Sequence, residues 1–278
     1  MGRCMSTVGS SSDTVTSGGL SVEPVPRTVS LSQSSLLIRE TFGPTWQGEG
    51  AHTGRLAYFI RTGGCGLHCE WCDEPKTWVF DERHARMHRS GVRYDPKVVL
   101  SRIEPGELAD RALAALPNHG CVVITGGEPL LQGQRLTALV SSLVTRTGAS
   151  YCIEIETAGV VMPPRDPIWR YVRFNVSPKL SHSGNTEEER YKPDVLDELR
   201  SRQSEFKFVV RNEADLTEVR QIVADIGIRN EHVWIMCEGT TAQNQLSSMR
   251  NISEAVLALG WNLSPRMHVL IWNGEEKR

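Results

Sequence analysis

Apolar runs of strand length alternate with helical segments along most of the chain, and this alternation limits the fold more than any other feature. Apolar residues recur at helical spacing over 136–143, before Gly148, and helical segments also follow Asp95-Pro96 and Asn212 and span 245–259. Such alternation predicts a mostly parallel sheet with helical crossovers. Six strands are predicted, at 57–62, 121–125, 151–155, 172–176, 206–210 and 233–237.

Six strands are too few for a closed eight-stranded barrel, so a partial α/β barrel and an open doubly wound sheet both fit the pattern. In either fold, the functional residues belong on the loops that follow the carboxyl ends of the strands. Residues 1–33 are rich in Ser, Thr and Gly and lack hydrophobic periodicity, which predicts a disordered extension ahead of one domain at 34–278.

Charge and hydropathy exclude several classes of function. The 278 residues include 31 basic and 33 acidic side chains, a formal net charge of −2, so no overall field favours nucleic acid or a membrane surface. No apolar run reaches the roughly 18 residues that a membrane span requires. The N-terminus lacks the apolar core of a secretory signal, so we expect a cytoplasmic protein.

The seven cysteines do not form the pattern of a disulfide framework. Cys121, Cys152 and Cys237 lie in or beside β-branched apolar runs and are predicted to be small buried hydrophobic side chains. Cys4 lies in the N-terminal extension and has no predicted role.

The other three cysteines follow the first predicted strand directly. Cys65, Cys69 and Cys72 have C-x3-C-x2-C spacing, which lets three thiolates converge on one small cluster. A four-iron cluster held by three cysteines leaves one iron open to a ligand, whereas electron-transfer clusters usually have four cysteine ligands. The alternative is a structural zinc site with His68 or His84 as its fourth ligand.

This spacing after the first strand resembles the signature of the radical S-adenosylmethionine (AdoMet) superfamily. The resemblance implies that AdoMet chelates the open iron and that one electron from the cluster cleaves it, giving a 5′-deoxyadenosyl radical that abstracts hydrogen from substrate. The turn Thr125-Gly126-Gly127-Glu128-Pro129, after the second strand, resembles the superfamily's segment that contacts the AdoMet amino group.

Two carboxylates alternate in the third strand. Glu154 and Glu156 point to one face of the sheet, which is either solvated or lined with hydrogen-bonding partners. Glu156 lies at the end of the strand and is our candidate for binding the ribose hydroxyls.

A narrower resemblance, over about 41–272, rests on the loop Thr45-Trp46-Gln47-Gly48-Glu49-Gly50, on Arg61, on Ser177-Pro178-Lys179 and on Leu263-Ser264-Pro265-Arg266-Met267-His268. These segments resemble the 7-carboxy-7-deazaguanine synthase family. The family implies a partial (β/α)6 barrel, a homodimer, Mg²⁺ and an electron donor such as flavodoxin. It also implies conversion of 6-carboxy-5,6,7,8-tetrahydropterin to 7-carboxy-7-deazaguanine with loss of ammonia and regeneration of AdoMet, in the synthesis of queuosine and related 7-deazapurines.

The same resemblance implies the roles of individual residues. The pterin would be contacted by Trp46, Gln47, Gly48, Glu49, Arg61, Thr125 and His268. AdoMet would be contacted by Trp71, Cys72, Asp73, Gly127, Glu128, Glu156, Ser177, Pro178, Lys179, Met236, Cys237, Glu238 and Gly239. A guanidinium suits a substrate carboxylate because it can bind it through two hydrogen bonds, although a salt-bridged Arg61 is the alternative. For His268 the alternative is a satisfied core histidine.

The chain departs from the family pattern at two positions. Glu74 stands where the family usually has a threonine that helps to bind Mg²⁺, and we expect this oxygen donor to bind or to neighbour the cation. Cys237 stands where proline is common. Two other functions stay open: an activase that installs a glycyl radical on a partner protein, and a non-catalytic metal-binding module.

Overall fold

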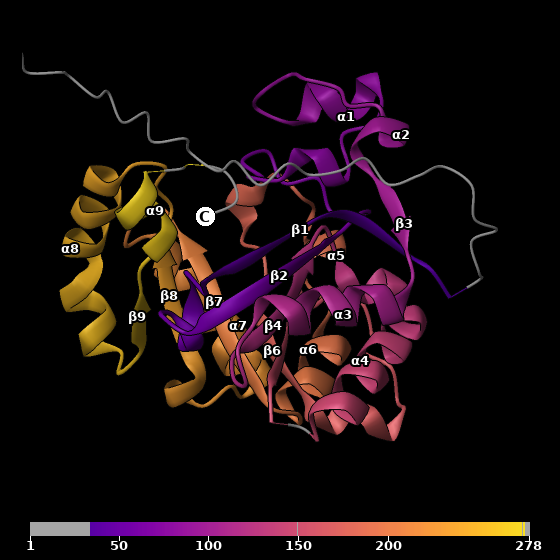
Figure 1. Cartoon of the computed structure of the whole chain (residues 1–278). Coiled ribbons are helices and arrows are strands. Elements are labelled where there is room, and N and C mark those ends of the chain that lie inside the picture. Colours follow the sequence, from indigo (N-terminus) through magenta and orange to yellow (C-terminus); the bar gives the residue numbers. More distant parts are fainter. Residues whose placement is uncertain (1–33, 149, 274, 276–278) are drawn as a thin grey trace, which may run out of the picture. The chain divides into compact units, whose positions relative to one another are not determined.

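Six parallel strands, hydrogen-bonded in the order in which they occur along the chain, form the centre of the fold (Figure 1). The computed structural model describes residues 34–148, 150–273 and 275. The predicted extension at 1–33, with Cys4 in it, lies outside these residues. The six strands are β2 (Leu56–Thr62), β4 (Cys121–Gly126), β5 (Cys152–Thr157), β6 (Val172–Val176), β7 (Ser204–Val210) and β8 (Val233–Cys237).

Three further strands complete the sheet in the described part of the chain. β1 (Leu36–Trp46) pairs antiparallel with β2, and β3 (Ser101–Ile103) pairs antiparallel with β1 at one edge. β9 (Asn262–Ser264) pairs parallel with β8 at the other edge. A doubly wound sheet requires a point where the strand order reverses. No reversal occurs between β2 and β9, so the predicted partial barrel is confirmed and the doubly wound alternative is wrong.

Helices pack against one face of the curved sheet (Figure 1). Val122 and Ile124 of β4 belong to the main apolar core together with helical residues such as Leu136. The intervening residues, Cys121 and Val123, face the interior of the barrel. The helices are α1 (Glu82–Met87), α2 (Pro96–Val99), α3 (Pro105–Ala115), α4 (Gly133–Thr147), α5 (Glu187–Arg190), α6 (Pro193–Arg200), α7 (Asp215–Ile226), α8 (Ala242–Ala258) and α9 (Met267–Trp272).

Local sequence signals account for most element boundaries. Helix α4 ends at Gly148, which has a left-handed backbone with φ of 57°. The side chain of Asp95 caps α2 as predicted, but that helix lasts only four residues because Leu100 turns into extended backbone toward β3. Cys121 and Cys237 are fully buried, as predicted, whereas Cys152 is half-buried.

The strands that were not predicted have weak patterns. β1 contains Pro44 and two register shifts against β2, so its apolar residues do not alternate regularly. β3 and β9 each span three residues, too few for a periodic signal.

Candidate active site

The three-cysteine loop leaves the carboxyl end of β2 and folds into an apolar pocket. Cys69 is buried with Leu67 and Ala158. Cys65 and Cys72 pack against a second group of apolar side chains, which includes Trp78. Burial raises the pKa of all three thiols, that of Cys72 to about 12. Thiols in such surroundings ionise only when a bound metal compensates the charge, as cluster ligands do.

Hydrogen-bond donors surround these sulfurs. Asn185 Nδ2 donates to Cys69 Sγ at 3.2 Å, and the backbone N–H of Leu67 donates to Cys65 Sγ at 3.4 Å. Asn185 also accepts a hydrogen bond from the backbone of His68 at 2.9 Å, so it joins the loop to the segment after β6. N–H···S contacts of this kind stabilise the charge on cluster sulfurs, so this donor set fits an iron–sulfur cluster.

The zinc alternative has no support in the geometry. The imidazole of His68 lies 3.5 Å from a carboxylate oxygen of Glu189, and that of His84 lies 3.0 Å from Asp81. Among residues 34–148, 150–273 and 275, no group of three His, Cys, Asp or Glu side chains converges as a single-ion site requires.

The Gly126-Gly127-Glu128 turn packs directly on the cysteine loop. Gly127 N–H donates to the carbonyl of Thr62 at 3.1 Å, and Glu128 N–H donates to the carbonyl of Gly64 at 2.8 Å. A Cβ atom at Gly127 would lie 2.0 Å from that carbonyl oxygen, so only glycine allows this approach.

The side chain of Glu128 ties the turn to the end of β5. It is fully buried and accepts hydrogen bonds from Thr157 Oγ1 and the backbone N–H of Ala158, both at 2.8 Å. Burial raises the pKa of its carboxyl despite these donors. The turn predicted to contact AdoMet therefore lies beside the predicted cluster ligands, at the carboxyl end of the barrel.

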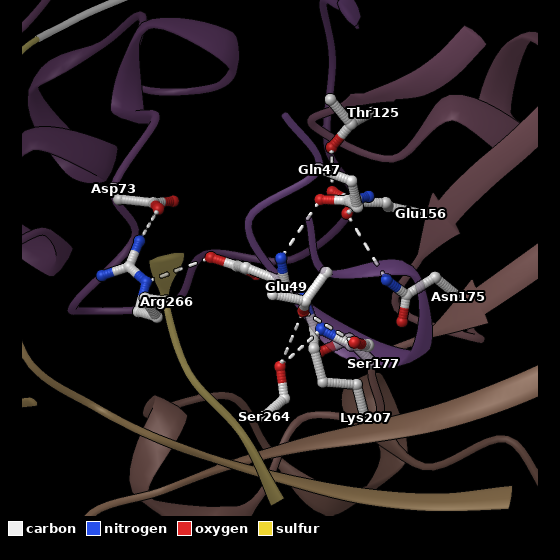
Figure 2. A network of polar contacts seen from close by, with 12 residues as sticks. Gln47, Glu49, Asp73, Thr125, Glu156, Asn175, Ser177, Lys207, Ser264 and Arg266 are labelled. Carbon is white, nitrogen blue, oxygen red and sulfur yellow. Dashed lines mark hydrogen bonds and ion pairs between the residues drawn. The ribbon is translucent and has the colours of Figure 1, made fainter. Parts of the chain in front are cut away.

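The interior of the barrel is polar where the loop after β1 enters it (Figure 2). Gln47 is buried, and its Nε2 donates to Glu154 Oε1 at 2.5 Å and to Glu156 Oε1 at 3.1 Å. Thr125 Oγ1 donates to the other oxygen of Glu156 at 2.7 Å. The face that carries both glutamates is therefore interior and hydrogen-bonded rather than solvated.

A charged network joins this interior to the C-terminal segment (Figure 2). Glu49 pairs with Lys207 and accepts a hydrogen bond from Arg266 Nε at 3.0 Å, while Arg266 Nη2 donates to Asp73 at 2.7 Å. Burial opposes ionisation of Glu49, but Lys207, Arg266 and His268 hold the pKa of its carboxyl well below its usual range.

Several of these interior residues were not predicted as site residues. Lys207 interrupts the apolar run at 206–210, and a buried lysine there is a signal that sequence reasoning could have used. Arg266 lies in a segment that was noted only as a motif. No sequence signal pointed to Asn185 or to Asn175, whose Nδ2 lies 3.5 Å from Glu156 Oε1.

Helix α9 and the 46–50 loop lie against each other. The backbone N–H of Met267 donates to the carbonyl of Gly48 at 2.8 Å, and the rings of Trp46 and Trp272 stack 5.5 Å apart. A Cβ atom at Gly48 would lie 2.3 Å from Nδ1 of His268. Burial lowers the pKa of His268, so its imidazole is mostly neutral near pH 7.

Arg61 lies among carboxylates. Its Nε is 3.3 Å from Glu40 and 4.0 Å from Glu74, and its guanidinium lies 5.4 Å from the centre of the Phe42 ring. Glu74 also lies 3.4 Å from Arg39 Nε, and burial raises the pKa of its carboxyl. Both side chains are thus in a salt-bridged group, the arrangement that sequence analysis left open for Arg61.

The remaining predicted AdoMet contacts occupy two more strand ends. The segment Ser177-Pro178-Lys179 follows β6. Lys179 Nζ donates to Ser177 Oγ at 3.0 Å and lies 6.0 Å from the centre of the Trp71 ring. After β8, the carbonyl of Gly239 accepts a hydrogen bond from Arg266 at 3.1 Å. The side chain of Cys237, next to Met236 and Glu238, belongs to the helix-facing core, so only its backbone borders the barrel end.

A partial α/β barrel with three cysteines after its first parallel strand and a Gly-Gly-Glu turn after the second defines the radical AdoMet iron–sulfur class. The family model described as a 4Fe-4S single cluster domain matches residues 46–192. The 7-carboxy-7-deazaguanine synthase of Pyrobaculum aerophilum is 33% identical over 227 residues, which cover 81% of this chain and 90% of the relative. The chain belongs to the 7-carboxy-7-deazaguanine synthase family.

Further comparisons agree. The synthase of Hyperthermus butylicus is 31% identical over 256 residues, with 88% of this chain and 96% of the relative covered. The crystal structure of QueE from Escherichia coli has the same fold, with a TM-score of 0.60 at 23% identity, covering 84% of this chain and 97% of that one. No helix in the described residues is long and apolar enough to cross a membrane.

Proposed function

We propose that this chain is a radical AdoMet lyase that converts 6-carboxy-5,6,7,8-tetrahydropterin into 7-carboxy-7-deazaguanine, with loss of ammonia, in 7-deazapurine synthesis of the queuosine type. The observation that carries the proposal is that a three-cysteine loop lies at one end of a partial barrel whose interior has a buried polar lining. The chain that contains both belongs to the synthase family.

The cofactor half of the site is built on three strand ends. We assign the four-iron cluster to Cys65, Cys69 and Cys72. The hydrogen bond that Asn185 donates to Cys69 Sγ supports this assignment. When bound, the cluster supplies the single electron that starts radical chemistry on AdoMet. We assign AdoMet to the turn at Gly127, to the neighbouring side chains of Trp71 and Lys179, and to the backbone after β8.

The substrate half is the polar interior. A pterin ring carries several N–H donors on its pyrimidine edge, and buried carboxylates such as those of Glu49 and Glu156 are suitable acceptors for them. We propose that the loop Trp46–Glu49 and Thr125 line this pocket and that His268 covers it. We assign the substrate carboxylate to Arg61, which is salt-bridged to Glu40 and Glu74 but whose buried Nε makes no hydrogen bond to the described residues.

The accessory requirements are also proposals. We propose that Glu74 binds or neighbours Mg²⁺ next to the cysteine loop, since a carboxylate is a suitable ligand for this ion. We further propose a cytoplasmic homodimer that receives electrons from a donor such as flavodoxin. Family membership supports these assignments, and the six described cysteines are free thiols, as in a reducing compartment.

The test is turnover under anaerobic conditions. The reconstituted protein is mixed with 6-carboxytetrahydropterin, AdoMet, reductant and Mg²⁺, and 7-carboxy-7-deazaguanine is sought by mass spectrometry, with Cys69→Ala as the inactive control. We expect product from the unmodified chain alone. Release of 5′-deoxyadenosine without product would reject the substrate but retain radical chemistry. Absence of both, in protein shown to hold its cluster, would reject the assignment.

A further inference from the structure

A histidine reaches the buried carboxylates from the end of the barrel opposite the cysteine loop. His52 closes the short helical turn η1 (Gly50–His52), which packs against β7, β8 and β9. Its Nδ1 pairs with Glu154 Oε2, while the other oxygen of that carboxylate accepts the hydrogen bond from Gln47. The interior therefore contains a continuous chain of contacts from His52 through Glu154 and Gln47 to Glu156.

The far side of His52 borders a cavity. This cavity has a volume of about 380 Å³ and lies at the amino ends of β6 and β7, where Arg173, Glu205 and His232 also line it. Only 16% of the His52 side chain is exposed, and Glu154 is buried between the cavity and Gln47. Solvent can therefore reach the imidazole without passing through the substrate pocket.

The charges of the interior explain why this contact matters. Lys207 and Arg266 neutralise Glu49, whereas His52 is the only basic side chain within ion-pair distance of Glu154 in the described residues. A buried carboxylate that loses its partner is strongly unfavourable and must either protonate or move. Protonation weakens the hydrogen bond that Gln47 donates to Glu154, and movement of the carboxyl group breaks it.

We propose that His52 is a positioning residue for the substrate pocket: its imidazolium fixes Glu154, which fixes Gln47 and through it Glu156 and the 47–50 loop. This inference rests on the proposed function and deepens it, because the groups so held are those assigned to the pterin. The cavity would then be the route by which His52 exchanges protons with the solvent, so that the pH of the solvent affects the substrate pocket.

The expected pH dependence has a definite sign. The hydrogen bond that the His52 imidazole donates to the Glu154 carboxylate raises the pKa of His52, against the opposing effect of burial. Cys152 acts in the same direction and Arg55 against it, and the charged or titratable side chains that line the cavity beside His52 are Glu154, Arg173, Arg200, Arg202, Glu205, Arg229 and His232. The ion pair is complete below the usual range of histidine and is lost as the pH rises through the raised pKa. Pterin KM should therefore rise over the same interval.

The experiment compares three variants. His52→Asn keeps a donor toward Glu154 without the charge, and His52→Ala removes both. His232→Asn is the matched control, because His232 lines the same cavity and pairs with Glu205 at 3.1 Å but has no contact with Gln47. Steady-state turnover is measured across pH with the pterin and AdoMet varied separately, and unfolding of each protein is followed in parallel.

We expect His52→Ala to raise pterin KM roughly tenfold near neutral pH, with a smaller change in kcat and none in AdoMet KM. His52→Asn should show an intermediate KM that no longer responds to pH in this interval, and His232→Asn should match the unmodified chain. Imidazole, which fits the cavity, should restore the KM of His52→Ala, whereas triazole, which stays neutral near pH 7, should not.

Two outcomes overturn the inference and are distinguishable. If the unmodified chain turns over the pterin but the KM of folded His52→Ala and its pH response are unchanged, the positioning role is wrong and the proposed function stands. If the unmodified chain neither binds nor converts the pterin, the function and the positioning role fail together. If His52→Ala does not fold, the pH response of His52→Asn against His232→Asn decides between the same alternatives.

Discussion

The contact between Gly127 and the cysteine loop leads to a quantitative prediction. In Gly127→Ala the new Cβ would lie 2.0 Å from the carbonyl oxygen of Gly64 and 3.2 Å from Cys65 Cβ. Cβ atoms essentially never lie closer than 3.0 Å to another heavy atom, so the backbones at Gly127 and Gly64 must move apart by about 1 Å. The displaced atom belongs to a carbonyl that already accepts the N–H of Glu128, and no flexible side chain can absorb the shift.

We expect two consequences of this displacement. Overpacking of a rigid site costs roughly 1–3 kcal/mol, which lowers Tm by about 2–4 °C for each kcal/mol in a chain of this size. Because Gly64 directly precedes Cys65, the shift also moves one of the three proposed ligands. The variant should therefore hold clearly less than one cluster per chain after reconstitution.

Gly66→Ala provides the matched control in the same loop, because no atom lies within 4 Å of a Cβ at Gly66. Iron and acid-labile sulfide per chain, together with Tm of the cluster-free proteins, are measured for both variants. The reasoning would be refuted if Gly127→Ala had the cluster content and Tm of Gly66→Ala.

Three further predictions concern the charged and polar groups. Glu49→Gln should lower the free energy of unfolding by about 3–5 kcal/mol, because buried Lys207 loses its ion-pair partner and Arg266 keeps only Asp73. Since the folded pKa of Glu49 is lowered, its stabilisation is complete above the usual glutamate range and is lost as the pH falls, so denaturant titrations should show a flatter acid limb in the variant. Asn185→Ala should make the cluster harder to reduce in a redox titration, because the donor to Cys69 stabilises the more negative, reduced form; an unchanged potential would contradict this. Glu74→Ala should weaken the Mg²⁺ dependence of turnover and Glu74→Asp should retain it, whereas identical Mg²⁺ titrations of Glu74→Ala and the unmodified chain would exclude the cation role.

Much of the fold was predictable because it depends on local patterns. The six parallel strands were each located within two residues at either end, since buried parallel strands are continuous apolar runs. β1 was not predicted, because its Gly43-Pro44 peptide and its register shifts interrupt any alternation. The choice of a barrel over a doubly wound sheet depends on strand order, which no local pattern encodes.

The site was predictable only where a motif is contiguous. The cysteine loop and the turn at Gly127 carry their geometry in neighbouring residues, so their positions at strand ends followed from the sequence. The contact between Gln47 and Glu154 joins residues 107 positions apart, and only the three-dimensional fold brings them together. Charges within strand-like runs were the visible signs of this interior, and of these Glu154 and Glu156 were noted in the sequence whereas Lys207 was not.

Under the proposed pterin assignment, the loop after β1 links the stability of the barrel to substrate recognition. Its first part, at Gln47 and Glu49, contributes the groups assigned to the pterin, and its second part, ending at His52, closes the other end of the barrel. Buried charges of this kind are costly unless each has a partner, and here the partners come from β5, β7 and the C-terminal segment. A substitution in this interior therefore changes folding and recognition together, whereas an equally buried residue on the helix-facing side, such as Val122, should affect folding alone. Measuring both effects would therefore separate residues that serve the proposed reaction from those that only support the barrel.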